Sequence, residues 1–233
     1  MPVPLLVTGT DTDVGKTWIS CLLLRLLTQD GHSVRPYKPV CSGGEVSGDG
    51  MIWNDVEQLS SACICNPSDD IKRRVCPQTF RAAVAPNVAA LLEDRTVDDE
   101  LLRTGALTWD DDCDLLLIEG AGGILCPLSD ETRVIDLAVA LQAPVLIVAA
   151  NRLGVINHTF LTVEAARRAG LSVAAVILND VTPGTDDSSR SSNFDQLKHW
   201  LPATRLLRCE YRGIALIDET GSRCSVRDLW LSR

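Results

Sequence analysis

The chain has 233 residues, of which 45% are hydrophobic and 23% charged, a composition typical of a globular protein with a sizeable core. Its net charge of −9 at pH 7, with no basic run to neutralise phosphates, argues against non-specific binding to nucleic acid or to anionic membranes. No apolar stretch approaches the roughly 18 residues of a transmembrane helix, and the first predicted strand begins too early to leave room for a signal peptide, so we expect a cytoplasmic protein.

The first predicted elements enclose a glycine-bearing loop. An apolar strand stops at Gly9, and an apolar-periodic helix is predicted from about Thr17 to Gln29, closed by Gly31. Strand, loop, Gly-Lys-Thr and helix in this order are typical of a phosphate-binding loop. The unpaired N–H groups at a helix N-terminus and the helix dipole both attract an anion.

The residues of this loop predict a nucleotide triphosphate site. Lys16 is expected to reach the terminal phosphates, and the Thr17 hydroxyl to take one coordination position on Mg²⁺. The strict pattern requires a glycine where Thr10 stands, and Gly9 comes one residue early. An ordinary strand–turn–helix unit is therefore the alternative interpretation.

A second strand is predicted from Ser33 to Val40, and it carries Lys38 in a mostly apolar setting just before a loop. This lysine is either a charge on an edge strand or a cation aimed at the phosphate site. The second interpretation follows because the C-terminal ends of strands in open α/β sheets line the ligand crevice. The glycines of Cys41–Gly44 allow a turn or the close approach of a ligand.

Patterns are weakest over residues 45–110. Short helices are predicted over Asp55–Ser60 and Val84–Glu93, and a surface helix and loop within the acid-rich stretch Val97–Asp112. Neither an internal repeat nor a low-complexity linker marks a boundary, so residues 1–233 are expected to form one domain.

A clear signal returns where Leu115–Ile118 leads into Glu119 and the glycine-rich run Gly120–Gly123. Four consecutive apolar residues that end in an acid are how a buried parallel strand delivers a carboxylate to Mg²⁺. The glycines allow the backbone to pass close to a ligand. A buried strand followed by an unrelated loop acid is the alternative.

The rest of the chain alternates between helices and strands. The predicted elements are a helix over 135–141, a strand over 144–149, a helix over 159–169, a strand over 173–178, a helix over 193–200, a strand over 204–207 and a helix over 226–231. Several of the strands are wholly apolar, which predicts a mostly parallel α/β sheet covered by helices on both faces, as in P-loop NTPases. Asn179 follows one strand, where its amide could read a purine edge or simply form a turn.

The nine cysteines include no C-x-x-C pair and no paired histidine spacing. We interpret most of them as small hydrophobic residues of a reducing compartment.

Taken together, these motifs resemble the dethiobiotin synthetase family over about residues 5–182. The resemblance is carried by the segments Gly9–Thr17, Tyr37–Val40, Glu119–Gly123, Pro127–Asp130, Leu153–His158 and Asn179–Val181. It implies a homodimeric enzyme of biotin biosynthesis that uses diaminopelargonic acid, CO₂ or bicarbonate, and ATP with Mg²⁺. In that reaction one amine captures CO₂ as a carbamate, ATP converts the carbamate to a carbamic–phosphoric anhydride, and the second amine closes the ureido ring of dethiobiotin.

The resemblance also implies roles for residues at the substrate. Lys16 would bridge the phosphates and the carbamate, and Lys38 would stabilise the carbamate and the transferring phosphoryl group. Ser42 and Thr12 would contact the diamine, with Thr12 counted among the catalytic residues. Asn157 would help to hold the tail carboxylate of the substrate from the partner subunit.

The implied magnesium ligands are Thr17, Asp55 and Glu119, with Asp49 and Glu57 as nearby alternatives to Asp55. Asn179 would face adenine. The residues expected to contact the nucleotide are Asp13, Val14, Gly15, Lys16, Thr17, Asp55, Glu119, Gly120, Ala121, Gly122, Asn179 and Asp180.

Two segments depart from the family pattern. Asn87 stands where the family usually has histidine, and Arg208–Tyr211 replaces the segment that lines the base pocket, which leaves the choice between ATP and CTP open. The main competing function is a dimeric ATPase switch of the partition type, but such proteins carry a lysine where this chain has Asp11. A nucleotide-binding relative without turnover and an amide-forming ligase with another substrate are also compatible with these motifs.

Overall fold

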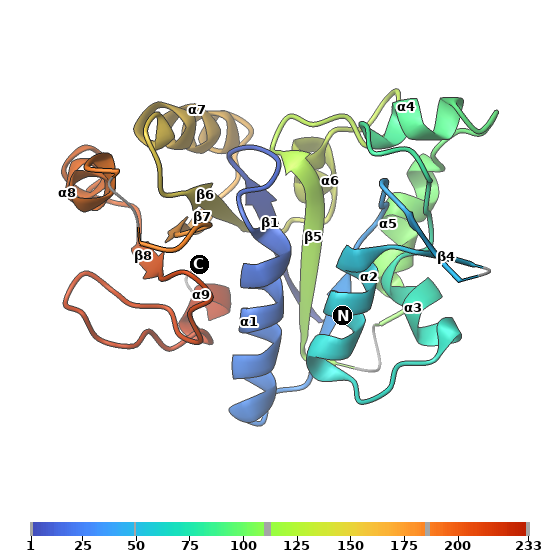
Figure 1. Cartoon of the computed structure of the whole chain (residues 1–233), viewed down its shortest axis with the longest axis horizontal. Coiled ribbons are helices and arrows are strands. Elements are labelled where there is room, and N and C mark those ends of the chain that lie inside the picture. The colour runs from blue at the N-terminus through green and yellow to red at the C-terminus, as the bar shows by residue number, and fades with distance from the viewer. Residues whose placement is uncertain (1, 49, 110–112, 185–186, 232–233) are drawn as a thin grey trace.

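The computed structural model describes residues 2–48, 50–109, 113–184 and 187–231. Its centre is a six-stranded sheet in the order β2-β5-β1-β6-β7-β8, and every pairing in it is parallel (Figure 1). The strands are β1 (Val3–Gly9), β2 (Val34–Tyr37), β5 (Leu115–Gly123), β6 (Val145–Ala150), β7 (Val173–Asn179) and β8 (Leu206–Cys209).

The burial of these strands follows from their sequences. Every residue of β6 is buried, as expected for an apolar run that is covered on both faces. The edge strand β2 contains Pro36, which lacks a backbone N–H and is tolerated in a sheet mainly at an edge.

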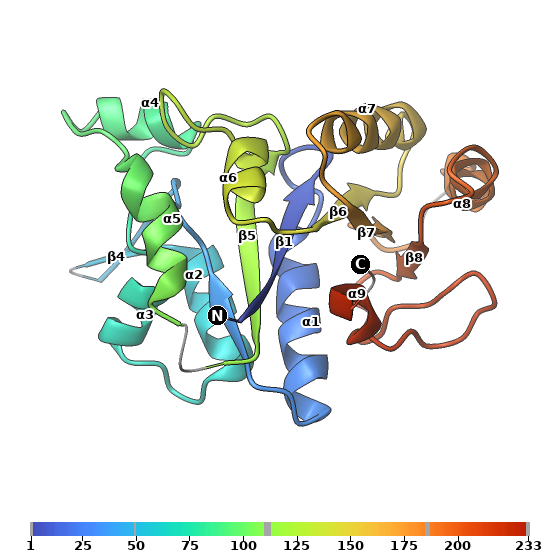
Figure 2. The ribbon, with the colours of Figure 1, turned by 180° about the vertical axis from the view of Figure 1, so that it is seen from behind.

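Helices cover both faces of the sheet, which confirms the predicted fold class. Figures 1 and 2 show α1, α2 and α9 on one face and α6 and α7 on the other. In the described part of the chain, no helix is both long and apolar enough to cross a membrane. The helices are α1 (Lys16–Gln29), α2 (Asn54–Cys63), α3 (Asp69–Val75), α4 (Pro86–Leu91), α5 (Asp99–Leu107), α6 (Val134–Ala140), α7 (Val155–Arg168), α8 (Ser189–Trp200) and α9 (Asp228–Leu231).

Some elements differ from the sequence prediction. A hairpin of β3 (Glu45–Ser47) and β4 (Gly50–Ile52), and the helix α3, were not predicted. Helix α7 begins four residues before the predicted start, after Gly154 at φ 92°. The acid-rich stretch contains α5, but its last residues, 110–112, lie outside the described residues.

The parallel arrangement places the predicted motifs at one edge. Strands β1, β5 and β7 end at the carboxyl edge of the sheet, and Lys38 directly follows β2 at the same edge. Helix α1 begins there with Lys16 and Thr17, so the phosphate-binding loop and Glu119 lie close together.

Candidate active site

The phosphate-binding loop depends on two glycines. Gly15 has φ 86°, and a Cβ placed on it would lie 2.2 Å from Asn179 Nδ2. A Cβ on Gly9 would lie 2.5 Å from the carbonyl oxygen of Asp11 and 3.1 Å from Lys16 Nζ. Gly9, the glycine that comes one residue early in the motif, therefore leaves room for the loop backbone and for the side chain of Lys16.

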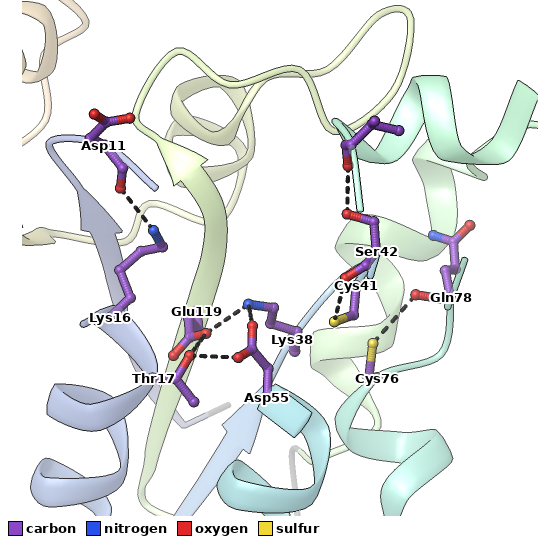
Figure 3. Close-up of polar contacts among 11 residues, drawn as sticks. Asp11, Lys16, Thr17, Lys38, Cys41, Ser42, Asp55, Cys76, Gln78 and Glu119 are labelled. Atoms are coloured by element: carbon purple, nitrogen blue, oxygen red, sulfur yellow. Dashed lines mark hydrogen bonds and ion pairs between the residues drawn. The ribbon is translucent and has the colours of Figure 1, made fainter. Parts of the chain in front are cut away.

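Lys16 is held by its own loop. Its Nζ donates a hydrogen bond to the carbonyl oxygen of Asp11 at 3.0 Å, and its side chain is buried (Figure 3). Burial lowers the pKa of Lys16, and the positive charge of Lys38 lowers it further. The two ammonium groups therefore lie close enough to repel each other across one pocket.

Lys38 lies in a cluster with two carboxylates and a hydroxyl. Its Nζ is 2.7 Å from Glu119 Oε1 and 2.8 Å from Asp55 Oδ2 (Figure 3). The Thr17 hydroxyl lies 3.0 Å from Glu119 Oε1 and 3.0 Å from Asp55 Oδ1, and its single proton can serve one carboxylate at a time. The four side chains come from α1, the end of β2, α2 and β5.

The cluster sets the charges of its members. Burial lowers the pKa of Lys38, but the carboxylates of Glu119 and Asp55 outweigh this effect and hold the pKa well above its ordinary value. Burial raises the pKa of Asp55, and the contact with Lys38 reverses that, so the net shift is downward. Lys38 is therefore a buried cation whose charge is balanced by its neighbours.

The donor set fits a magnesium ion. Carboxylate and hydroxyl oxygens are the hard ligands that Mg²⁺ prefers. Glu119 is fully buried, and its Oε2 has no hydrogen-bond partner among the described residues. Of the two acids considered in place of Asp55, Glu57 instead pairs with Lys72 at 2.7 Å, and Asp49 lies outside the described residues.

A pocket of about 610 Å³ opens beside this cluster. Ser42 lies at its wall and donates a hydrogen bond to the carbonyl oxygen of Val84 at 2.6 Å (Figure 3). Of the predicted site residues, the pocket is lined by Thr12, Asp13, Gly15, Lys16, Thr17, Lys38, Ser42, Asp55, Ala121 and Gly122. Cys126 and Pro86 also line it and were not predicted.

A second pocket of about 530 Å³ shares Asp13 and Gly15 with the first. The predicted residues Asn179 and Asp180 line it, and Asn179 Nδ2 donates to the carbonyl oxygen of Val14 at 3.0 Å. Its remaining lining residues, which were not predicted, are Trp18, Val181, Tyr211 and Arg212. The sequence feature that could have identified Trp18 as a site residue is its position immediately after Gly-Lys-Thr.

Four predicted residues lie outside both pocket walls: Glu119, which is buried in the cluster with Lys38, and Val14, Gly120 and Asn157. The Val14 side chain is buried, and a Cβ on Gly120 would lie 2.8 Å from Val134, so both residues serve the packing of their loops. Asn157 is exposed on α7, away from both pockets. Its proposed contact with substrate across a dimer stays a prediction.

Sequence comparison identifies similar proteins. The chain matches the family described as AAA domain over residues 4–213. It is 38% identical over 205 residues to the ATP-dependent dethiobiotin synthetase BioD of Rhodopirellula baltica, covering 83% of this chain and 78% of that protein. It is 44% identical over 185 residues to BioD of Anaeromyxobacter sp. (strain K), covering 79% of each. It is 36% identical over 210 residues to BioD 1 of Salmonella typhi, covering 90% of each.

Structural comparison bears on the fold alone. The cell division protein ftsY of Thermotoga maritima aligns with a TM-score of 0.52 over 99% of this chain and 67% of that one, at 14% sequence identity. This similarity supports the P-loop NTPase-like arrangement of the sheet and its first helix.

Proposed function

Because this chain belongs to the family of ATP-dependent dethiobiotin synthetases, we propose that it forms dethiobiotin from diaminopelargonic acid, CO₂ and ATP in biotin biosynthesis. The observation that carries the proposal is the convergence of Lys16 and Lys38 on one pocket beside Glu119. A ureido-forming reaction needs such a site, because a carbamate and a triphosphate are both anions and must be brought together.

The attraction between a lysine and an anionic ligand in this pocket is large enough to affect the reaction. At about 4 Å and an effective dielectric constant near 20, one pair of unit charges contributes about 4 kcal/mol. Lys16, together with Lys38 once part of its contact with Asp55 and Glu119 is released, would therefore offset much of the repulsion between carbamate and γ-phosphate. Phosphoryl transfer otherwise asks mainly for positioning and charge stabilisation.

The proposed chemistry has three steps. One amine of the substrate attacks CO₂ and loses a proton, which leaves a carbamate near Lys16 and Lys38. A carbamate oxygen then attacks the γ-phosphorus of ATP, and the bond to ADP breaks. The second amine attacks the carbonyl carbon of the anhydride, inorganic phosphate leaves, and the lost proton goes to solvent or to phosphate.

Thr17, Asp55 and Glu119 are the residues that would hold Mg²⁺. When bound, the ion would neutralise charge on the β- and γ-phosphates. Lys38 shares both carboxylates with that proposed site, so it must exchange part of its contact with them in order to face the carbamate. Thr12 and Ser42, at the wall of the same pocket, would contact the diamine.

We also propose that the enzyme is a homodimer that acts in the cytoplasm. Leu161 on α7 is 62% exposed, and Leu125, which lines the same shallow pocket, is 52% exposed. Apolar side chains gathered on one face favour burial against a partner. A second copy on this face would carry Asn157 of the partner subunit toward the substrate.

The deciding experiment uses labelled bicarbonate, MgATP and diaminopelargonate. The expected result is label in dethiobiotin, and its loss in Lys38→Ala while Lys72→Ala, a surface lysine paired with Glu57, retains it. An active Lys38→Ala enzyme would reject the assignment of Lys38.

The same preparation separates the competing functions. ATP hydrolysis that DNA or membranes accelerate and that the diamine does not affect would favour a partition-type ATPase. Such a switch is disfavoured by Asp11, which lies 3.9 Å from Arg152 and stands where those proteins carry a lysine. Nucleotide binding without product would indicate a relative that has lost turnover.

A further inference from the structure

The second pocket, where Asn179 is expected to face adenine, has an aromatic lining to which the expected roles assign nothing. Besides Asn179 and Asp180 it is lined by two aromatic side chains, Trp18 and Tyr211, although aromatic residues make up only 4% of the chain. Because it meets the first pocket at Asp13 and Gly15, a ligand whose phosphates lie on the loop can extend into it. The part of such a ligand that lies beyond the phosphates would then meet these aromatic rings.

Trp18 forms part of the wall of the second pocket and is not part of the hydrophobic core. It lies in the first turn of α1 and is half-buried, whereas Trp109 and Trp230 are each 1% exposed within the core. Its Nε1 atom is buried next to the thiol of Cys209. With the polar edge of the indole turned inward, the surface that Trp18 presents to the pocket is aromatic carbon.

The loop after β8 supplies the second aromatic residue. Tyr211 is 38% exposed, and the guanidinium of Arg212 lies 5.3 Å from the centre of its ring. A planar cation and an aromatic ring both stack on flat heterocycles. Asn179, by contrast, already uses its amide nitrogen on Val14, which leaves fewer polar groups free to read a base edge.

We propose that Trp18 is the stacking platform for the nucleotide base, and that stacking rather than hydrogen bonding sets nucleotide affinity at this site. Stacking is tolerant of base identity, because every base has a π-face. The wild-type protein should therefore bind MgATP, MgCTP and MgGTP with dissociation constants within about tenfold of one another. This inference rests on nucleotide binding at the loop, which is part of the proposed function, but not on the ligase reaction.

Isothermal titration calorimetry on the full chain tests the inference with two ligands, MgATP and magnesium tripolyphosphate. Loss of base–aromatic stacking costs about 1–3 kcal/mol, which corresponds to roughly 5- to 150-fold in affinity. Trp18→Ala should weaken the binding of MgATP by about tenfold or more and leave the binding of tripolyphosphate unchanged. Trp18→Phe should keep most of the affinity for MgATP. Trp200→Ala, which removes a 63% exposed tryptophan on α8, is the matched control and should change neither ligand.

Several outcomes would overturn the inference. The first two are an unchanged MgATP affinity in Trp18→Ala and an equal loss of affinity for both ligands. The third is a wild-type preference of more than about 100-fold for one base, because apolar pockets discriminate by up to about 100-fold and hydrogen-bond reading by about 10⁴- to 10⁵-fold. If Trp18→Ala does not fold, Trp18→Leu removes the ring, keeps apolar bulk and gives the same comparison. Base-dependent binding without dethiobiotin formation would reject the proposed ligase function and leave this inference standing.

Discussion

Replacing Lys38 with methionine should destabilise the metal-free protein strongly. Lys38 is 3% exposed and its partner Glu119 is fully buried, with 2.7 Å between Nζ and Oε1. Methionine has a similar length and keeps the apolar contacts, but it leaves the Glu119 carboxylate without a counter-charge. Removing one partner of a buried ion pair costs about 3–5 kcal/mol. The Asp55 side chain is 39% exposed, so solvent screens its pair with Lys38, and we assign the loss to Glu119.

Urea unfolding in the presence of EDTA at neutral pH measures this loss. The double variant Lys38→Met/Glu119→Gln should recover part of the stability, because no bare buried charge remains. Lys72→Met, whose partner Glu57 is 37% exposed, is the control and should lose at most about 1 kcal/mol. A Lys38→Met protein that loses less than about 1 kcal/mol, or a double variant as unstable as the two single variants added together, would refute the reasoning.

Three further variants or conditions test different parts of the structure. Tyr37→Phe should lower the free energy of unfolding, measured in urea, by about 1–2 kcal/mol. The buried Tyr37 hydroxyl lies 2.9 and 3.0 Å from two backbone carbonyl oxygens of α5, and an unchanged free energy would contradict these contacts. Gly15→Ala should abolish MgATP binding in calorimetry, since its Cβ would lie 2.2 Å from Asn179 Nδ2, and an unaltered affinity would show that the loop does not need this backbone conformation. The free energy of unfolding should fall as the pH rises above about 9. The reason is that burial raises the pKa of the Cys41 and Cys209 thiols to about 11, whereas the same thiols in the unfolded chain ionise at lower pH. Equal urea midpoints at pH 8 and pH 10 would exclude this.

Residues that follow apolar strands could be placed from the sequence. Lys38 follows β2 and Glu119 lies within β5, and neighbouring parallel strands bring equivalent positions to one edge. Asp55 is harder to place, because α2 comes after a segment with weak periodicity. Its contact with Lys38 depends on packing between α1 and α2 that a short, mixed sequence does not reveal.

Asn179 and Asp180 of the second pocket were predicted, but most of its other walls were not, because they are distant in sequence. Trp18 lies in the first turn of α1, whereas Tyr211 and Arg212 lie in a loop after the last strand of the sheet. No periodicity links such residues. The hairpin over Glu45–Ile52 was missed for another reason: its first strand is fully exposed, so it has no alternation between apolar and polar residues to detect.

The two edges of the sheet restrict how copies of this protein can associate. At one edge, Pro36 interrupts the row of N–H groups on β2. At the opposite edge, Arg208 of β8 is already bridged to Ile217 of the following segment. A foreign strand therefore finds no continuous ladder at either border, which protects against open-ended fibrous growth. Self-association is left to helical surfaces, where contacts between two copies can close on themselves.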